Sequence, residues 1–470
     1  MTPLPGFRLP TRHHPAPEVR DLPAPPERTW RLIGPGLVAS GVGLASGEFV
    51  LCPFIASQVG LVFLWGMVLG VVLQWFLNLE IERYTLATGE TALTGFSRLW
   101  RPWGLVFVGL VLFANAWPGW ATSSATLLTY VTGGDVATIT VVMLAATGAI
   151  LTLAPVVYTA LERLVIVKLI VIGGFFLLAL GLAVGAGSWA ALGSAVTHAG
   201  RLPDLDVALL LGAIAFAGAG GGPNLCQSNW IRDKGFGMGA HLPRLVSPVT
   251  GEPAATASAR AVVFPVTEAN LARWRRWWRF AGLEQALAFA LVTAVTIVLT
   301  SVLAHATLFG RPGLPNGIDF LRLEGEALAR AAGGWFGSLF WVIGAYSLFA
   351  ATVGIVDYSA RLAADVIKGT YLRDRALSES GVYSLIVWAL VGTSATIVFF
   401  GVRQPLALLV ISACTGGVMM CVYAILLAVL NTTTLPAPIA PTRWRIAVLL
   451  GASAFFGWLS VLMIRQQLGS

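Results

Sequence analysis

The chain has 470 residues, of which 57% are hydrophobic and only 11% are charged. Soluble proteins contain about 25% charged residues, so this composition excludes an ordinary soluble domain and indicates a protein that crosses a membrane many times. The net charge of +8 does not call for nucleic acid, because membrane proteins concentrate Lys and Arg in their inner loops. We expect a lipid bilayer as partner and no nucleic acid.

The N-terminal stretch is rich in Pro, His and Arg and lacks the apolar core of a signal peptide. We expect residues 1–31 to be a disordered cytoplasmic tail and residues 32–467 to form one transmembrane domain. The four cysteines lie in apolar segments, so they predict no disulfide framework.

Apolar runs long enough to cross a bilayer as helices recur eleven times along the chain. The stretch 232–279 between two of these runs contains eight Lys or Arg against three Asp or Glu, which places it in the cytoplasm. With an odd number of spans, we expect a cytoplasmic N-terminus and an extracytoplasmic C-terminus in the cell membrane. The runs lie near residues 34–55, 59–82, 104–131, 136–157, 164–186, 205–231, 280–307, 335–360, 381–401, 404–430 and 444–464.

The first span contains Ala45, Ser46 and Gly47, followed directly by the carboxylate of Glu48. A charge at the centre of a membrane helix costs roughly 2.5–3.5 kcal/mol, so such an acid usually faces a cavity or a partner. Glycine lowers the cost of breaking a helix. The stretch predicts either a packed face with one buried Glu or a discontinuous helix that holds a substrate.

The sixth span also contains residues that would interrupt a helix, namely several glycines followed by a proline. Proline cannot donate in a helix interior but suits the first turn of a new half-helix, whose amides would point into a break. A simple proline kink is the alternative. The residues concerned are Gly218, Gly220, Gly221, Gly222, Pro223 and Asn224.

Two interrupted spans, five apart, are typical of inverted-repeat transporters whose site lies between the broken helices. We therefore expect an all-α membrane protein with a LeuT-like fold of the APC superfamily. It would have a 5+5 inverted repeat and about eleven transmembrane helices, with helices one and six broken. Repeat one would cover about 34–190, repeat two about 205–430, and an extra helix about 444–464.

Several runs resemble the Nramp (natural resistance-associated macrophage protein) family of divalent metal transporters: Gly34-Pro35-Gly36, GLVFLWGMVLGVVLQ, the Pro-Asn-Leu of the sixth span, and VYAILLAVLNTT. The resemblance implies the same fold and transport of a divalent metal. The family's metal-binding Asp falls on Ala45 and its Met on Gly221, and its proton-carrying acids of span three fall on Asn115 and Pro118. The resemblance therefore does not extend to manganese or iron selectivity or to proton coupling.

One carboxylate with amide and carbonyl oxygens is a hard-ligand set that suits Mg²⁺ or Ca²⁺ better than Mn²⁺ or Fe²⁺. We expect Glu48 and Asn224 to be the metal ligands. The same groups would also suit a small organic solute, such as an amino acid, amine or organic acid, and a non-transporting receptor is a further reading. The candidate substrate-binding residues are Ala45, Ser46, Gly47, Glu48, Gly218, Gly221, Asn224 and Gln227.

In the eighth span, Asp357, Arg361 and Asp365 lie on one helix face at i, i+4 and i+8. They predict an intramembrane ion pair, or a coupling-ion site at Asp357 if that residue faces the first span. We find no enzyme motif and no phosphate-binding Gly-Lys-Ser/Thr motif. We expect a monomeric secondary transporter that works by alternating access and needs no cofactor.

Overall fold

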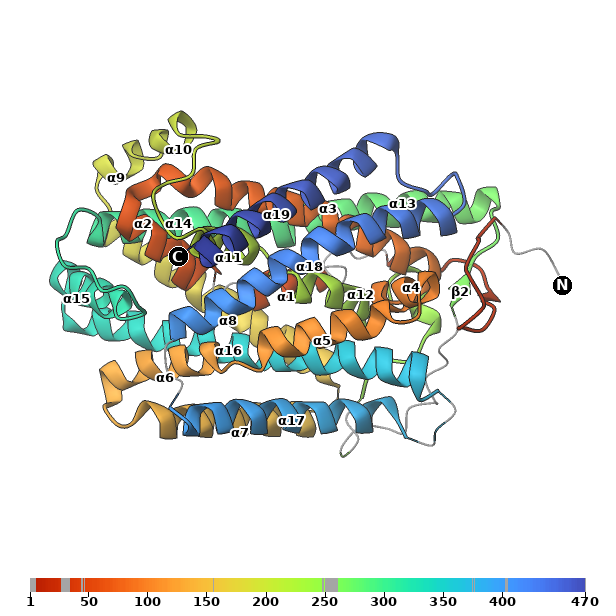
Figure 1. The fold of residues 1–470 in the computed structure, drawn as a ribbon, viewed down its shortest axis with the longest axis horizontal. Helices are drawn as coiled ribbons and strands as arrows, with labels where there is room; N and C mark the ends of the chain where they lie inside the picture. Colours follow the sequence, from red (N-terminus) through yellow and green to blue (C-terminus); the bar gives the residue numbers. More distant parts are fainter. Residues whose placement is uncertain are drawn as a thin grey trace.

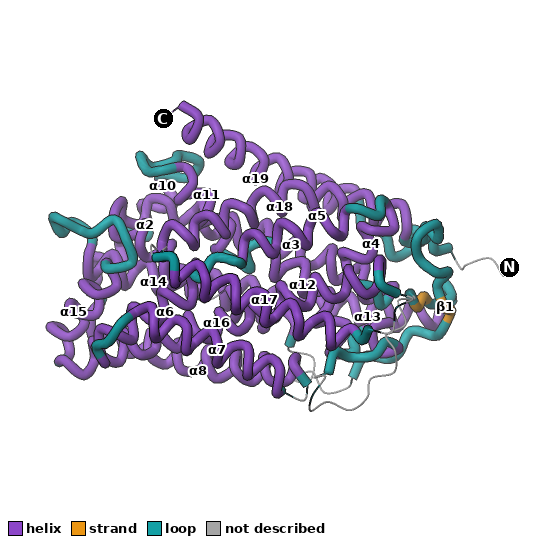
Figure 2. The backbone as a smooth tube through the Cα atoms, turned by 60° about the horizontal axis from the view of Figure 1, so that its bottom comes forward, coloured by secondary structure: helices purple, strands orange, loops and turns teal. Residues whose placement is uncertain are grey.

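The computed structural model of the protein describes residues 6–26, 34–43, 45, 47–154, 156–246, 249, 261–373, 375, 377–401 and 405–469. Long helices run side by side along one axis (Figure 1), and most loops lie at the two ends of the bundle (Figure 2). Within these ranges nine helices are long and apolar enough to cross a membrane. One of them, Pro35–Thr88, contains the first two predicted spans, and the interrupted sixth span is additional. The prediction of about eleven spans is confirmed.

The first repeat contains the first five spans. Its elements are α1 (Pro35–Gly43), the π-helical turn η2 (Gly47–Leu51), α2 (Cys52–Val59), the 3-10 turn η3 (Gly60–Phe63), α3 (Leu64–Thr88), α4 (Ala92–Leu99), α5 (Trp103–Asn115), α6 (Gly119–Thr132), α7 (Val136–Leu153) and α8 (Val157–Ala183). Two short helices, α9 (Ala186–Ala190) and α10 (Gly193–Thr197), lead to the second repeat.

The second repeat is followed by one extra helix, α19 (Arg443–Gly469), which packs on α18. The repeat consists of α11 (Val207–Phe216), α12 (Gly222–Lys234), the 3-10 turn η4 (Gly237–His241), α13 (Glu268–Glu284), the π-helical turn η5 (Gln285–Leu291), α14 (Val292–Leu308), α15 (Phe320–Ala332), α16 (Gly334–Val366), the π-helical turn η6 (Ile367–Tyr371), α17 (Glu379–Phe399) and α18 (Pro405–Thr434).

The contacts between half-helices follow from the inverted repeat. Because the first and sixth spans run in opposite directions, the first half of one lies beside the second half of the other: α1 packs against α12, and η2 packs against α11. The LeuT-like fold with breaks in spans one and six is confirmed.

The expected disordered tail is wrong for residues 6–26, which we call the N-terminal strap. Its β1 strand (Glu18–Val19) pairs in parallel with β2 (Val262–Val263). Phe7, Leu9 and Leu22 are buried. The strap is ordered because the protein supplies partners for its extended backbone, as when Trp277 Nε1 donates to Pro23 O at 2.7 Å. Residues 27–31 lie outside the described ranges.

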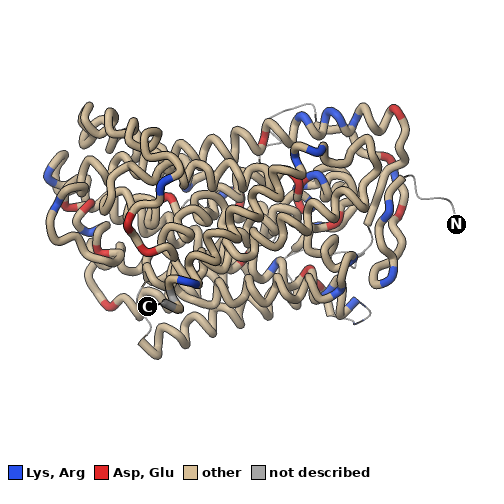
Figure 3. The backbone as a smooth tube through the Cα atoms, turned by 45° about the horizontal axis from the view of Figure 1, so that its top comes forward, with Lys and Arg blue, Asp and Glu red and all other residues tan. Residues whose placement is uncertain are grey.

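Charged residues gather toward the two ends of the bundle, and much of the backbone between them carries none (Figure 3). This is the distribution expected for helices whose middle lies in hydrocarbon. Charged residues inside the bundle, away from its ends, are therefore candidates for a functional role.

Candidate substrate site

The first span breaks between Gly43 and Gly47, where α1 ends and η2 begins. In an α-helix the N–H of Ala45 would donate to the carbonyl of Gly41. Instead it donates to Gly43 O at 2.6 Å. The carbonyl of Gly41 accepts a hydrogen bond from Lys168 Nζ at 2.7 Å, and this lysine on α8 is completely buried. An ammonium group thus takes the place of a backbone donor. The predicted site residue Ser46 lies outside the described residues.

The sixth span breaks between Phe216 and Gly222, and Gln74 on α3 fills the gap in hydrogen bonding. Its Oε1 accepts from the N–H groups of Ala219 at 2.8 Å and Gly220 at 3.1 Å. Its Nε2 donates to Ile214 O at 3.3 Å and Ala215 O at 2.9 Å. One buried amide therefore satisfies four backbone groups that would be costly to leave unpaired at membrane depth.

The two breaks touch through their backbones. A Cβ built on Gly43 would overlap the carbonyl oxygen of Gly218, and one on Gly47 would overlap that of Phe216. Glycine is required at both positions because no side chain fits between the chains. The structure thus brings together the predicted residues Gly47 and Gly218.

Glu48 lies in η2 directly after the first break and is 0% exposed. Neither of its carboxylate oxygens has a hydrogen-bond partner among the described residues. Its charge interacts with that of Lys168. A carboxylate in this position is free to receive a hydrogen-bond donor or a cation.

The other predicted residues fall into two groups. Ala45 is buried at the break, and the side-chain amide of Gln227 is buried without a partner in the described part of the chain. Asn224, in contrast, is occupied. Its Oδ1 accepts from the N–H of Gly221 at 2.8 Å, and its Nδ2 donates to Asn78 Oδ1 at 2.7 Å. The oxygen expected to bind a metal therefore caps α12.

Asp357 is held by an ion pair. Its Oδ1 accepts from Arg361 Nη2 at 3.0 Å and from the Tyr383 hydroxyl at 2.8 Å, and its Oδ2 accepts from Arg361 Nε at 3.2 Å. Arg361 also donates to Asp233 on α12. These bonds use both oxygens of Asp357 within the protein and join the sixth, eighth and ninth spans.

A second ion-pair group adjoins the first one along α16. Arg232 on α12 donates to Asp365 Oδ1 at 2.8 Å and to Glu379 Oε1 at 3.2 Å. We call Arg232, Asp233, Asp357, Arg361, Asp365 and Glu379 the ionic cluster. It connects the second half of the broken sixth span to α16 and α17.

The donor set is small for a divalent metal. Within the described ranges, no group of three or more His, Cys, Asp or Glu residues could hold a metal ion. Mg²⁺ and Ca²⁺ take six or more oxygen ligands, although Mg²⁺ keeps several waters. Glu48 and Gln227 are the predicted residues whose side-chain oxygens have no partner in the described structure.

Sequence reasoning missed three residues that shape this region: Lys168, Gln74 and Glu284. Glu284 Oε1 accepts from the N–H groups of Gly34 at 3.3 Å and Gly36 at 2.9 Å, at the start of α1. Lys168 was detectable, because a lone charge inside an apolar span signals function by the rule that singled out Glu48. The partners of Gln74 lie about 140 residues away, so no local pattern could reveal them.

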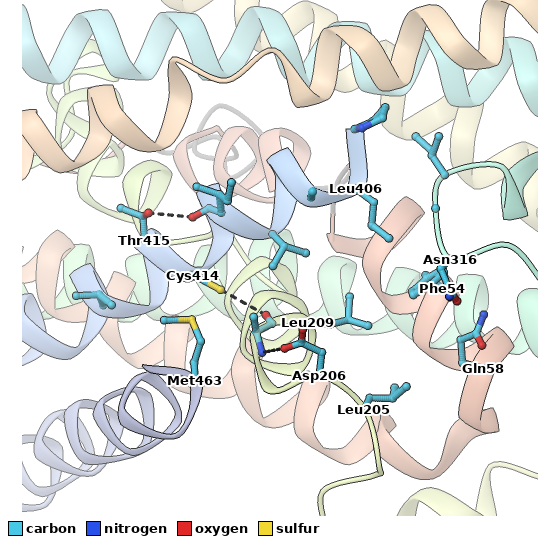
Figure 4. A pocket seen from close by; sticks show the side chains of 18 of the residues that line it. Phe54, Gln58, Leu205, Asp206, Leu209, Asn316, Leu406, Cys414, Thr415 and Met463 are labelled. Carbon is cyan, nitrogen blue, oxygen red and sulfur yellow. Dashed lines mark hydrogen bonds between the residues drawn. The ribbon is translucent and has the colours of Figure 1, made fainter. Parts of the chain in front are cut away.

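A cavity of about 1210 Å³ opens beside α2, α11 and α18 (Figure 4). Phe54 and Gln58 of α2 line it on one side, and Asp206, Leu209 and Cys414 line it on another. Asn316 lines it from the loop between α14 and α15. The cavity adjoins α2 and α11, the halves of spans one and six on one side of the breaks, and Glu48 does not line it.

No family model and no curated protein matches the sequence. Solved structures do resemble it. A manganese transporter of Eremococcus coleocola is 13% identical, with 96% of this chain and 90% of that chain covered and a TM-score of 0.68. The same transporter in complex with an aromatic bis-isothiourea substituted compound is 14% identical, with 97% and 90% covered and a TM-score of 0.68.

Mhp1, a nucleobase-cation-symport-1 family transporter, is 13% identical, with 94% of this chain and 95% of that chain covered and a TM-score of 0.50. At these identities the similarity establishes the arrangement of helices and not the substrate. The chain is a multi-pass membrane protein with the LeuT-like fold of these transporters.

Proposed function

We propose that this protein is a monomeric secondary transporter that binds a small solute beside Glu48 and moves it by alternating access. The observation that carries the proposal is the carboxylate of Glu48, which is 0% exposed and has no hydrogen-bond partner in the described structure. Such a group is costly at membrane depth and is typically retained for ion or substrate binding. The transporters that share the fold support this reading.

The geometry best supports a small organic solute with an amino group, such as an amino acid or an amine. One carboxylate is enough to pair with an ammonium group. The amide of Gln227, on α12 beyond the second break, is also buried without a partner in the described structure, and its N–H donors and carbonyl oxygen suit a polar solute. The start of α12 faces the break and favours a negative group, such as the carboxylate of a zwitterion.

A divalent metal cation is the second candidate, with an Mg²⁺-like ion favoured over Mn²⁺ or Fe²⁺. Glu48 and Gln227 offer hard oxygen ligands. One solved structure with the same fold is described as a manganese transporter. The occupied oxygen of Asn224 weighs against it. Because Asn115 and Pro118 stand where the resemblance expects acids, we propose transport without a proton carried by span three.

We further propose that the end of the bundle with the N-terminal strap is cytoplasmic and that the chain ends outside the cell. The strap and the Arg-rich helix α13 lie at the same end, and inner segments carry the excess of Lys and Arg. In this orientation the ionic cluster closes the inner side, and the cavity beside α2 is the outer entrance.

The test is ligand binding to detergent-purified protein, followed by thermal shift and calorimetry. The panel contains amino acids, amines, organic acids, Mg²⁺, Ca²⁺ and Mn²⁺. We expect at least one amino compound to stabilise the wild type and not Glu48→Gln. Glu324→Gln is the matched control, because Glu324 is also a buried acid but lies on α15. Binding that survives in Glu48→Gln would contradict the proposed site.

A further inference from the structure

Lys168 is a buried cation at the first break that no step of the proposed transport yet uses. It lies in the middle of α8, which packs along α1, and it is 0% exposed. Its ammonium group has three donors, and the hydrogen bond found for it in the described structure goes to Gly41 O at 2.7 Å. An ammonium group so deep in a membrane protein is expensive and calls for a functional reason.

Hydrogen bonding alone does not require a charge at this position. The carbonyl of Gly41 needs one donor because Ala45 N donates to Gly43 O. A neutral amide could supply that donor, as Gln74 does at the other break. The lysine therefore adds something that an amide would not, which is an amino group that can carry a positive charge beside the substrate site.

The charge of Lys168 balances that of Glu48. Lys168 binds the carbonyl of Gly41 just before the first break, and Glu48 follows directly after that break. When both groups are ionised, the pair carries no net charge. A divalent cation bound at Glu48 would bring two more positive charges near the ammonium group of Lys168 in a medium of low dielectric, where like charges repel strongly. A zwitterion adds no net charge, and its own carboxylate is attracted to the ammonium.

We propose that Lys168 determines the specificity of the site: its ammonium group excludes divalent cations and selects a zwitterionic solute. This inference rests on the proposed binding of substrate at Glu48. It assigns a role in the choice of substrate to a residue that otherwise would only hold the break in place.

The test uses variants that separate charge from hydrogen bonding. Lys168→Gln retains an N–H donor for Gly41 O and removes the charge, whereas Lys168→Arg retains the charge. Lys234→Gln is a control at another lysine near α1, where the ammonium pairs with Glu162 at 2.6 Å. Binding of Mg²⁺, Ca²⁺ and Mn²⁺ is measured by calorimetry on each purified protein.

We expect Lys168→Gln to bind a divalent cation at least about tenfold more tightly than the wild type, because a like charge has been removed. This gain should vanish in Lys168→Gln/Glu48→Gln and be absent from Lys168→Arg and Lys234→Gln. If the wild type and Lys168→Gln bind divalent cations with equal affinity, the inference is overturned.

The wild type provides a second test that does not depend on whether Lys168→Gln folds. A divalent cation that stabilises the wild type in a thermal-shift assay, and does so only with Glu48 present, would overturn the proposal. The proposed function has its own readout, which is the loss of amino-compound binding in Glu48→Gln. A gain of divalent binding in Lys168→Gln would thus support the role of Lys168 even if no amino compound bound.

Discussion

The side-chain amide of Gln74 lies against the backbone of Gly218, in space that a Cβ on residue 218 would occupy. A Cβ built there would lie 2.5 Å from Gln74 Oε1 and 2.7 Å from its Cδ. The glycine is needed because the amide must reach both the last carbonyls of α11 and the N–H groups inside the break. A side chain from the second span therefore stabilises the break in the sixth span by hydrogen bonds to its backbone.

Replacing Gln74 by Leu should destabilise the protein strongly. The substitution removes the partners of two backbone N–H groups and two carbonyls that are buried at the break. Each buried group left unsatisfied costs about 1–3 kcal/mol, so we expect a loss on the order of 3 kcal/mol after water has replaced some of these bonds. Unfolding by denaturant in detergent measures it. Gln58→Leu on α2 is the matched control and should cost much less.

The contact between Gln74 and Gly218 predicts strong coupling between their substitutions. Gly218→Ala alone should displace the amide and lower stability, because the new methyl group would collide with it. In a Gln74→Ala background the methyl group has room, so Gly218→Ala should cost much less there. A double-mutant cycle should give an interaction energy of about 1 kcal/mol or more. Additive effects would show that the amide does not fix the glycine.

The ionic cluster should be one of the strongest stabilising features of the fold. Removing one partner of a buried ion pair costs about 3–5 kcal/mol, because the other charge is left unpaired. Arg361 is buried between Asp357 and Asp233, so Arg361→Leu should fall in this range. Arg322→Leu is the control, because its pair with Glu326 has side chains 62% and 39% exposed. An exposed pair contributes about 0–1 kcal/mol. Thermal unfolding of the two variants distinguishes them.

The composition and the two glycine-rich stretches were enough to predict the fold class, the number of spans and both breaks. These features are local, because hydropathy and helix breakers act over a few residues. The hydrogen-bond partners of the backbone groups at the two breaks were not predictable. They are side chains far away in the sequence, and only the folded structure shows which of them lies beside each group. Asn224 is another example. An asparagine side chain can bind a metal, so the sequence suggested a ligand, but in the structure its Oδ1 accepts from the N–H of Gly221 and caps the helix.

The N-terminal strap was mispredicted for a related reason. A stretch rich in Pro and Arg has no hydrophobic periodicity, so its composition indicates disorder. Its order comes from donors on other elements, including Arg98 Nη1, which donates to Pro10 O at 2.7 Å, and the strand β2. Two apolar residues, Phe7 and Leu9, complete the packing.

The packing of the strap should weaken as the pH falls, through His14. This histidine is 2% exposed, and neither ring nitrogen has a partner among the described residues. Burial lowers the pKa of His14 from 6.5 to about 4, and the nearby Arg98 and Arg373 also lower it, against the effect of Glu90. A released strap would take up the proton at an ordinary pKa. Protonation therefore favours release, and stability is lost progressively from about pH 6.5 down to about pH 4.

A nitroxide label at Arg12→Cys, an exposed position in the strap, reports this release by electron paramagnetic resonance. We expect the label to become more mobile as the pH is lowered across that interval, and His14→Phe to abolish the change because phenylalanine stays buried without titrating. His13→Phe should keep the wild-type profile, since His13 is exposed. Identical profiles in the wild type and His14→Phe would show that the pH response does not come from His14.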